Sequence, residues 1–391
     1  MVGTLLAWGT LVHAQEPDYI IQSNAAPLNP LSVSQTARPA AATPPVPVPQ
    51  PASAPVSQPA PAPQPVPAPP AQAAPSAPPA VPGAKPALTI GVLLPTDSPD
   101  FGEAARVVRA GMDAAAATDG QASLEYVDEE PADLAARYRA LVASGARVIV
   151  GPLTRPGISA IAAHVTVPTL ALNGFEPGLK TNPRLLSLSL IVEGEARQVA
   201  HLMRDDGRAN PLVVSTADPL SKRLAQAFVD EWRKQTGAAP AVLAWPFTAP
   251  MTDTLAHADS VFIAMTPPEA AALKAALPGP LSVYATSQLD TRKPDAALAG
   301  IRFIDMPWFL MPEQAQVKRY PRPSAALTMQ TERLYALGID AYRLAVLMAK
   351  GKPVPGMLKL SGVTGDLQLG ADRQFERVLP LAVMMPDNNG Q

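Results

Sequence analysis

Small polar side chains and one arginine occur where a protein built around a sheet would bind a ligand. Each of them lies in a short loop after a run of apolar residues that is typical of a buried strand. The six residues are Thr96, Ser98, Thr154, Arg155, Asn173 and Ser287. Loops at the carboxyl ends of parallel strands present amide, hydroxyl and guanidinium groups to ligands. The pattern predicts contacts to a small anionic or zwitterionic ligand, with helix capping and turn formation as the alternative.

Residues that could carry catalysis or bind a metal are scarce. The chain has no cysteine, and its four histidines lack the i, i+4 spacing of a helical metal site. It contains no GxSxG, P-loop or GxGxxG motif. The acidic run 128–130 precedes a proline, which is typical of a solvated helix start. We therefore predict no catalytic residue, no metal and no cofactor, and a protein that is not an enzyme.

Three aromatic side chains stand out, because only 5% of the residues are aromatic. Trp308 follows an apolar run, and Tyr335 and Tyr342 lie on one segment with helical periodicity. We expect them to pack between two lobes, and a partner-binding surface is the alternative. Gly338, on the same segment, would let another backbone approach that helix closely.

Strand and helix patterns alternate along the chain, which is typical of parallel sheets with crossover helices. The first series has strands and helices at 88–94, 103–118, 123–127, 132–144, 147–150, 157–164 and 169–172. The second series has them at 193–204, 212–215, 219–235, 242–245, 260–265, 268–276 and 281–285. Each series is long enough to form one lobe with its own sheet.

The last part of the chain departs from this alternation. A segment at 301–308 leads to a long helix at about 325–350, followed by a hairpin that turns at Gly365 and a closing strand at 379–385. We predict a two-lobed α/β fold, each lobe a mostly parallel sheet flanked by helices. The predicted domain covers 87–388, with lobe 1 at about 87–191 and 306–352 and lobe 2 at about 192–305 and 353–388. Crossings between lobes would form a hinge.

The N-terminal part has a different composition. Between residues 27 and 86, about one residue in three is proline, and the only charges are Arg38 and Lys85. Such a stretch cannot bury enough apolar surface to fold, so 15–86 is predicted to be a disordered linker. An apolar run before a small-x-small motif predicts a signal peptide at 1–14 and export.

Charge and hydropathy narrow the classes of partner. The formal net charge is −2 with both signs interspersed, which argues against nucleic-acid binding. No segment after the N-terminal run is apolar for 18 residues, so no transmembrane span is expected in the mature chain.

Several segments together resemble the LppC/LpoA family of penicillin-binding protein activators. They are IGVLLP (90–95), VIVGPLTRPGISAI (148–161), VPTLALN (167–173), VYATSQL (283–289), AGIRFIDMPW (299–308), LYALGIDAYRLA (334–345) and LSGVTGDLQLGADRQFERVL (360–379). The resemblance spans nearly the whole predicted domain and implies a type I periplasmic-binding-protein-like fold.

The resemblance also implies a function: a non-enzymatic envelope protein that binds and activates a bifunctional penicillin-binding protein and so regulates peptidoglycan synthesis. The alternative is a periplasmic receptor for a small amino acid or peptide, with the ligand in the cleft. Family members are usually lipoproteins, and this chain has no lipobox cysteine. We therefore expect a periplasmic location, with outer-membrane association as a further expectation. The proline-rich stretch stands where the longer branch of the family has a helical domain, and in extended form it would reach on the order of 150–190 Å.

Overall fold

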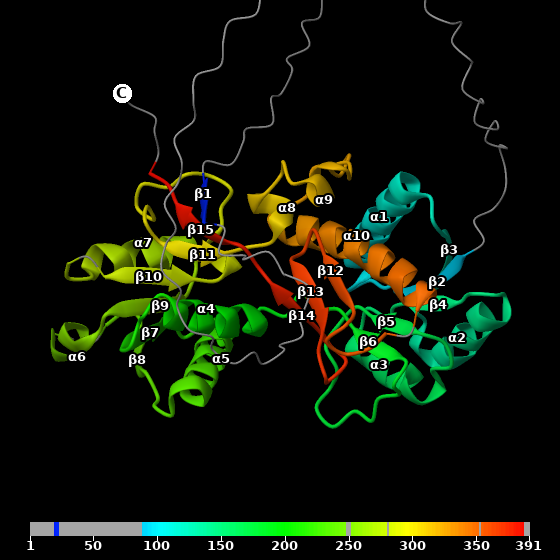
Figure 1. Cartoon of the computed structure of the whole chain (residues 1–391), viewed down its shortest axis with the longest axis horizontal. Helices are drawn as coiled ribbons and strands as arrows, with labels where there is room; N and C mark the ends of the chain where they lie inside the picture. The colour runs from blue at the N-terminus through cyan, green and yellow to red at the C-terminus, as the bar shows by residue number, and fades with distance from the viewer. Residues whose placement is uncertain (1–18, 23–87, 248–251, 280, 352, 387–391) are drawn as a thin grey trace, which may run out of the picture. The chain divides into compact units, whose positions relative to one another are not determined.

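The first lobe is built on a five-stranded parallel sheet in the order β3-β2-β4-β5-β6 (Figure 1). The computed structural model describes residues 19–22, 88–247, 252–279, 281–351 and 353–386. The strands are β2 (Thr89–Leu94), β3 (Ser123–Asp128), β4 (Val148–Val150), β5 (Thr169–Ala171) and β6 (Leu185–Ser187). The helices are α1 (Gly102–Asp119), α2 (Leu134–Ala143), α3 (Arg155–Ile161) and α10 (Met329–Lys350).

Both faces of this sheet are covered by helices. Val92 and Val150 belong to the apolar cluster that includes the buried sides of α1 and α10. Leu93 and Ile149 belong to the cluster formed with α2 and α3. Successive residues of a strand point to opposite faces, so a strand buried on both faces is apolar throughout. This explains why β2 and β4 are continuous apolar runs rather than alternating ones.

The long helix α10 crosses α1 at very short range. A Cβ atom on Gly338 would overlap the backbone oxygen of Val108, and a Cβ atom on Gly111 would overlap that of Tyr335. Glycine at both positions therefore lets the two backbones touch. The predicted close approach at Gly338 is confirmed, and it fixes α10 on the first lobe.

The second lobe has a seven-stranded sheet in the order β1-β15-β11-β10-β9-β7-β8. Its parallel strands are β7 (Pro211–Ser215), β8 (Ala241–Ala244), β9 (Ser260–Ala264), β10 (Ser282–Ala285) and β11 (Arg302–Ile304). Helices α4 (Glu193–Asp205) and α5 (Pro219–Thr236) share an apolar cluster with one face, whereas α6 (Thr252–His257) and α7 (Pro267–Ala276) contribute to the cluster on the other. The prediction of two lobes with mostly parallel sheets is confirmed.

Two antiparallel strands complete the second sheet. The predicted closing strand is β15 (Leu381–Met384), which pairs with β11. Its other edge pairs with β1 (Tyr19–Gln22). Residues 19–22 fall inside the predicted linker but before its proline-rich part, and they form this strand. The rest of the predicted linker and the predicted signal peptide lie outside the described residues.

Three crossovers join the lobes. They follow β6 (188–192), β11 (305–306) and β14 (379–380). Before the third crossover, the strands β12 (Lys359–Ser361), β13 (Asp366–Leu369) and β14 (Phe375–Val378) form a small antiparallel sheet, shown in orange-red in Figure 1. The predicted hairpin is confirmed as β12–β13, and β14 is a third strand that the sequence pattern did not indicate.

The small sheet is fixed to α10 by a buried carboxylate. Asp340 is fully buried and accepts hydrogen bonds from the amides of Val363 (3.0 Å) and Thr364 (2.8 Å). The Thr364 hydroxyl also donates to it, at 2.7 Å. Within the described part of the chain, no helix is long and apolar enough to cross a membrane.

Candidate functional site

The loop after β2 is held by its own side chains. The Thr96 hydroxyl donates to Oδ1 of Asp128 at 3.0 Å, and the Asp97 amide donates to the same oxygen at 3.0 Å. The Ser98 hydroxyl accepts a hydrogen bond from the Phe101 amide at 3.2 Å, just before α1. These contacts are those of turn and cap residues, the alternative that the sequence left open.

The loop after β4 binds a carboxylate of the same lobe. Thr154 is the N-cap of α3 and accepts from the Gly157 amide at 3.1 Å. The Glu129 carboxylate accepts from the amides of Leu153 (2.8 Å) and Thr154 (3.2 Å), and also from the Thr154 hydroxyl. Backbone amides that converge in a loop can bind an anionic ligand. Here a carboxylate of the same lobe already accepts from the two amides that precede α3.

Glu129 is therefore not part of a solvated helix start, as its acidic run suggested. Glu129 is only 3% exposed, because its side chain points inward beneath the loop after β4. Burial raises the pKa of Glu129, and the hydrogen bonds from Thr154 and Leu153 act against that rise by favouring the charged form.

Arg155 and Asn173 meet beside the same loop. The Arg155 Nε donates to Oδ1 of Asn173 at 3.4 Å, and its Nη1 lies 3.8 Å from the Glu176 carboxylate. The Asn173 Nδ2 donates to the Leu153 carbonyl at 3.2 Å. The structure thus brings Thr154, Arg155 and Asn173 together, but each is bound to neighbouring protein groups.

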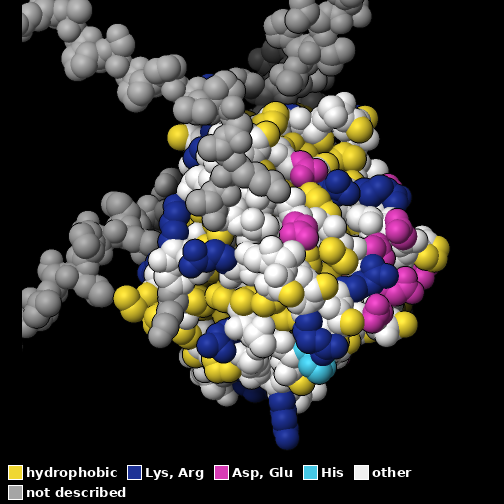
Figure 2. All heavy atoms as spheres, turned by 90° about the vertical axis from the view of Figure 1, so that its right-hand side faces the viewer, with side chains coloured by type: hydrophobic (Ala, Val, Ile, Leu, Met, Phe, Trp, Pro, Cys, Tyr) yellow, Lys and Arg dark blue, Asp and Glu magenta, His cyan; other side chains and the backbone are white. Residues whose placement is uncertain are grey.

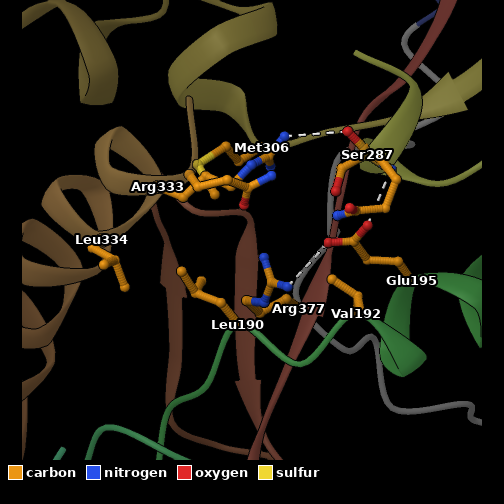
Figure 3. A pocket seen from close by; sticks show the side chains of 10 residues that line it. Leu190, Val192, Glu195, Ser287, Met306, Arg333, Leu334 and Arg377 are labelled. Carbon is orange, nitrogen blue, oxygen red and sulfur yellow. Dashed lines mark hydrogen bonds and ion pairs between the residues drawn. The ribbon is translucent and has the colours of Figure 1, made fainter. Parts of the chain in front are cut away.

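Ser287 lies elsewhere, at the end of β10, and it lines a pocket of about 280 Å³. Figure 3 shows this pocket from close by. Its lining residues come from the crossovers and the adjoining helices: Leu190, Val192, Glu195, Ser287, Gln288, Met306, Gln330, Arg333, Leu334 and Arg377. The pocket is at the lower end of the size range of small-molecule sites, which is about 300–1,000 Å³.

One wall of the pocket is a continuous polar chain (Figure 3). The Arg333 Nη2 donates to the Ser287 carbonyl at 3.3 Å. The Ser287 amide donates to Oε2 of Glu195 at 3.1 Å, and the Arg377 Nη2 donates to Oε1 of Glu195 at 3.4 Å. The backbone of Ser287 therefore links two ion pairs, Arg377–Glu195 and Arg333–Asp305.

Behind this wall, Arg333 forms a bidentate pair with Asp305. Its Nη2 donates to Oδ2 at 2.6 Å, and its Nη1 donates to Oδ1. Asp305 is fully buried, and burial raises its pKa to about 8, although the Arg333 guanidinium acts to lower it. Burial also lowers the pKa of Arg377, whose side chain is 7% exposed.

Glu195, Arg333 and Arg377 were not predicted from the sequence. A signal exists for Arg333: it precedes buried Ala336, Leu337 and Asp340 at helical spacing, so it lies on the buried stripe of α10. A charged residue at such a position is buried only with a partner. No comparable local pattern marks Glu195, because its partner Arg377 lies 182 positions away in the sequence.

The three predicted aromatic residues are buried. The Trp308 indole, in the short helix α8 (Pro307–Leu310), donates to the Glu332 carboxylate at 2.9 Å. Its ring centroid lies 5.7 Å from that of Tyr335, whose hydroxyl donates to the Pro321 carbonyl at 3.0 Å. The Tyr342 hydroxyl accepts from two amides of the α1–β3 turn, so Tyr342 packs within the first lobe. In this conformation none of the three rings is available to a partner.

Known proteins are similar to this chain over its folded part. Penicillin-binding protein activator LpoA of Yersinia pseudotuberculosis serotype O:1b (strain IP 31758) is 29% identical over 317 residues, which is 66% of this chain and 48% of that protein. The activator LpoA of Haemophilus influenzae (strain ATCC 51907 / DSM 11121 / KW20 / Rd) is 28% identical over 251 residues, covering 60% of this chain and 43% of its own length. The chain spans about half the length of the curated relatives it matches.

Solved structures share the fold. A protein from Chromobacterium violaceum ATCC 12472, described as a "putative branched-chain amino acid ABC transporter", is 54% identical, with a TM-score of 0.72 over 76% of this chain and 100% of that one. The LpoA C-domain from Haemophilus influenzae, described as a regulator of PBP1A, is 24% identical, with a TM-score of 0.62 over 76% of this chain and 97% of that one.

A family model covers most of the described residues. The family described as "LppC putative lipoprotein" matches 84–256 and 248–382, well over half of the chain. The segments that suggested this family from the sequence all lie inside those two ranges. On this evidence the chain belongs to the LppC family.

Proposed function

We propose that this chain is a non-enzymatic regulator that binds and activates a bifunctional penicillin-binding protein. The observation that carries the proposal is the LppC family match across 84–382, together with curated relatives named penicillin-binding protein activators. Those relatives are activators by name rather than enzymes. The proposed location is the periplasm, with outer-membrane association as a further proposal.

A second candidate is a receptor for a small amino acid, because the 54% identical structure is described as an amino acid transporter. The strand-end loops of the first lobe argue against it. Glu129 accepts from the Leu153 and Thr154 amides just before α3, and Arg155 is met by Glu176. A ligand carboxylate at that position would have to displace a buried carboxylate of the protein, at the cost of leaving it without hydrogen bonds.

The distribution of charge on this face of the first lobe does not identify a docking site for the synthase. Figure 2 shows the face at the right of Figure 1, where both signs of charge are interspersed with scattered apolar side chains. The match spans about half the length of the curated relatives, so the partner contact of this chain is a matter for direct binding measurements.

The test uses the purified full chain and a bifunctional penicillin-binding protein from the same envelope. We expect saturable binding with a dissociation constant on the order of 10 µM or tighter, and an increased rate of peptide cross-linking. The amino-acid receptor would instead show a rise in melting temperature with an amino acid and no change in cross-linking. Absence of both synthase binding and rate change would refute the proposed function.

A further inference from the structure

Basic residues are in excess in one segment of the first lobe. Residues 134–192, which include α2, β4, α3, β5 and β6, contain six Lys and Arg residues and one acidic residue. The formal charge of this segment is therefore +5, whereas that of the whole chain is −2. A local excess of one sign of charge attracts partners of the opposite sign.

Four of these six cations are unpaired within the described part of the chain. Arg137 lies 3.9 Å from the Glu130 carboxylate, and Arg155 is paired with Glu176. The remaining four are exposed, and no ion pair or side-chain hydrogen bond engages them in the residues described: Arg139, Arg147, Lys180 and Arg184. They are therefore available to an anion from outside the chain.

The three arginines among them gather at one end of the sheet. Arg147 immediately precedes β4, and Arg184 immediately precedes β6. Because β5 pairs with both strands, the backbones of these two residues are on the order of 10 Å apart. Arg139 follows Tyr138 on α2, and the Tyr138 hydroxyl accepts from the Thr166 amide, just before β5, at 3.2 Å. We call Arg139, Arg147 and Arg184 the arginine face.

The arginine face is at the opposite end of the sheet from the strand-end loops, because β4, β5 and β6 are parallel and the loops follow their carboxyl ends. Both signs of charge occur on the side of the molecule shown in Figure 2, but the visible acidic side chains lie in its upper and right-hand parts. In the lower part the charged side chains are those of Lys and Arg, beside one histidine. A partner bound at the arginine face would therefore not cover the strand-end loops.

The chemistry of this face fits a hydrated anionic polymer better than a lipid surface. Proteins that bind at a membrane interface insert apolar or aromatic side chains beside their basic residues. The exposed large apolar residues of the described chain all lie outside 134–192: Phe101, Val242, Val354, Met357 and Val378. Arginine also forms paired hydrogen bonds with planar carboxylates.

We propose that the arginine face binds the carboxylates of peptidoglycan peptides. This inference rests on the proposed function, because a regulator of the synthase works beside the polymer that the synthase makes. Several weak contacts to repeated carboxylates would together hold the first lobe on the polymer. The bound domain would then remain close to the site of cross-linking, with its other faces free for the synthase.

Co-sedimentation of the purified full chain with isolated peptidoglycan sacculi tests the proposal without any synthase. At about 50 mM salt we expect saturable retention with a dissociation constant on the order of 10 µM. Retention should fall at least about fivefold at about 500 mM salt, because exposed charges are then screened. Sacculi whose carboxylates have been converted to amides should retain the chain at least about fivefold less, because the attracting charge is gone.

Charge reversal locates the site. Arg147→Glu combined with Arg184→Glu should weaken retention at least about fivefold, since two attractions become repulsions. The matched control is Arg197→Glu with Lys222→Glu, which changes the net charge equally at two exposed positions of the second lobe and should leave retention within about twofold. If the reversed arginine face lowers the melting temperature, Arg147→Gln with Arg184→Gln removes the charges without adding new ones and should still weaken retention.

Three results would each overturn the proposal: no retention at low salt, equal retention of the wild type and the reversed arginine face, and equal retention by native and amidated sacculi. Tighter binding to phosphatidylglycerol vesicles than to sacculi would also overturn it, and would identify an anionic lipid as the ligand. Failure here leaves synthase binding unaffected, whereas a chain that binds sacculi but neither binds nor activates the synthase would refute only the proposed function.

Discussion

The strand-end loops of the first lobe and the pocket at the crossovers are both rich in charged and polar groups. They differ in how completely the protein satisfies the hydrogen-bonding groups of each region. In the loops, Glu129 accepts from the Leu153 and Thr154 amides just before α3, and Glu176 meets Arg155, so these donors have partners within the lobe. In the pocket, two buried ion pairs leave the Arg333 Nε without an acceptor among the residues that the structure describes. The comparison indicates that a polar loop in the expected place is not by itself a binding site. What matters is which donors remain after the protein has satisfied its own.

The largest difference should appear when one guanidinium is removed from each region. At pH 9, above the pKa of Asp305, Arg333→Met leaves the Asp305 carboxylate buried without its partner, and we expect a loss of about 3–5 kcal/mol in the free energy of unfolding. The matched control is Arg155→Met, in which an ion pair that is about half exposed is lost at a cost of about 0–1 kcal/mol. Urea denaturation measures both. Similar losses for the two variants would show that the crossover pair is not energetically distinct.

The pH dependence of stability should also separate the regions. The pKa of Asp305 is raised to about 8 in the folded protein, so the folded state holds a proton that the unfolded state releases above about pH 4. The contribution of Asp305 to stability is therefore fully present below about pH 4. It is lost as the pH rises from about 4 to 8, with a slope of at most about 1.4 kcal/mol per pH unit. Asp305→Asn, which mimics the protonated form, should flatten the profile between pH 5 and 8 relative to the wild type. An unchanged profile would contradict this assignment.

A moderate loss of stability is expected when the carboxylate that binds the amides just before α3 is removed. Glu129→Ala removes the acceptor of two amides and one hydroxyl, which should cost about 1–3 kcal/mol in unfolding free energy. If Glu129 acts as a built-in anion, acetate should restore part of the melting temperature of this variant, and chloride at equal ionic strength should not. Glu129→Gln is the control, because it keeps an acceptor and should lose less stability.

The smallest effect is expected at Ser98. Ser98→Ala removes the acceptor for the Phe101 amide in the turn before α1 and should cost about 0.5–1 kcal/mol. Activation of the synthase should remain at the wild-type level. A selective loss of activation without loss of stability would make Ser98 a functional residue after all.

Local patterns in the sequence were sufficient for most of the architecture. The apolar runs of β2 and β4, the helical periodicity of α10 and the turn at Gly365 all depend on neighbours a few residues apart. Gly338 is the same kind of case, since an absent side chain on a buried helix stripe indicates a close contact. The strand 19–22 was missed because composition was averaged over a long window that proline dominates.

The charged interior was decided by the tertiary structure. Glu129 follows Asp128 in an acidic run that resembles a solvated turn, and only the approach of the loop between β4 and α3 shows that its side chain is turned inward. Arg377 and Glu195 become partners because the third crossover brings β14 beside α4, and Arg333 meets Asp305 because α10 returns to the first lobe. The sequence by itself determined the two sheets, their helices and the family, because periodicity and glycine placement are local properties. Which charges are buried together, and which cations are left exposed on one face, depends on desolvation and on distances between segments that meet only in the folded chain.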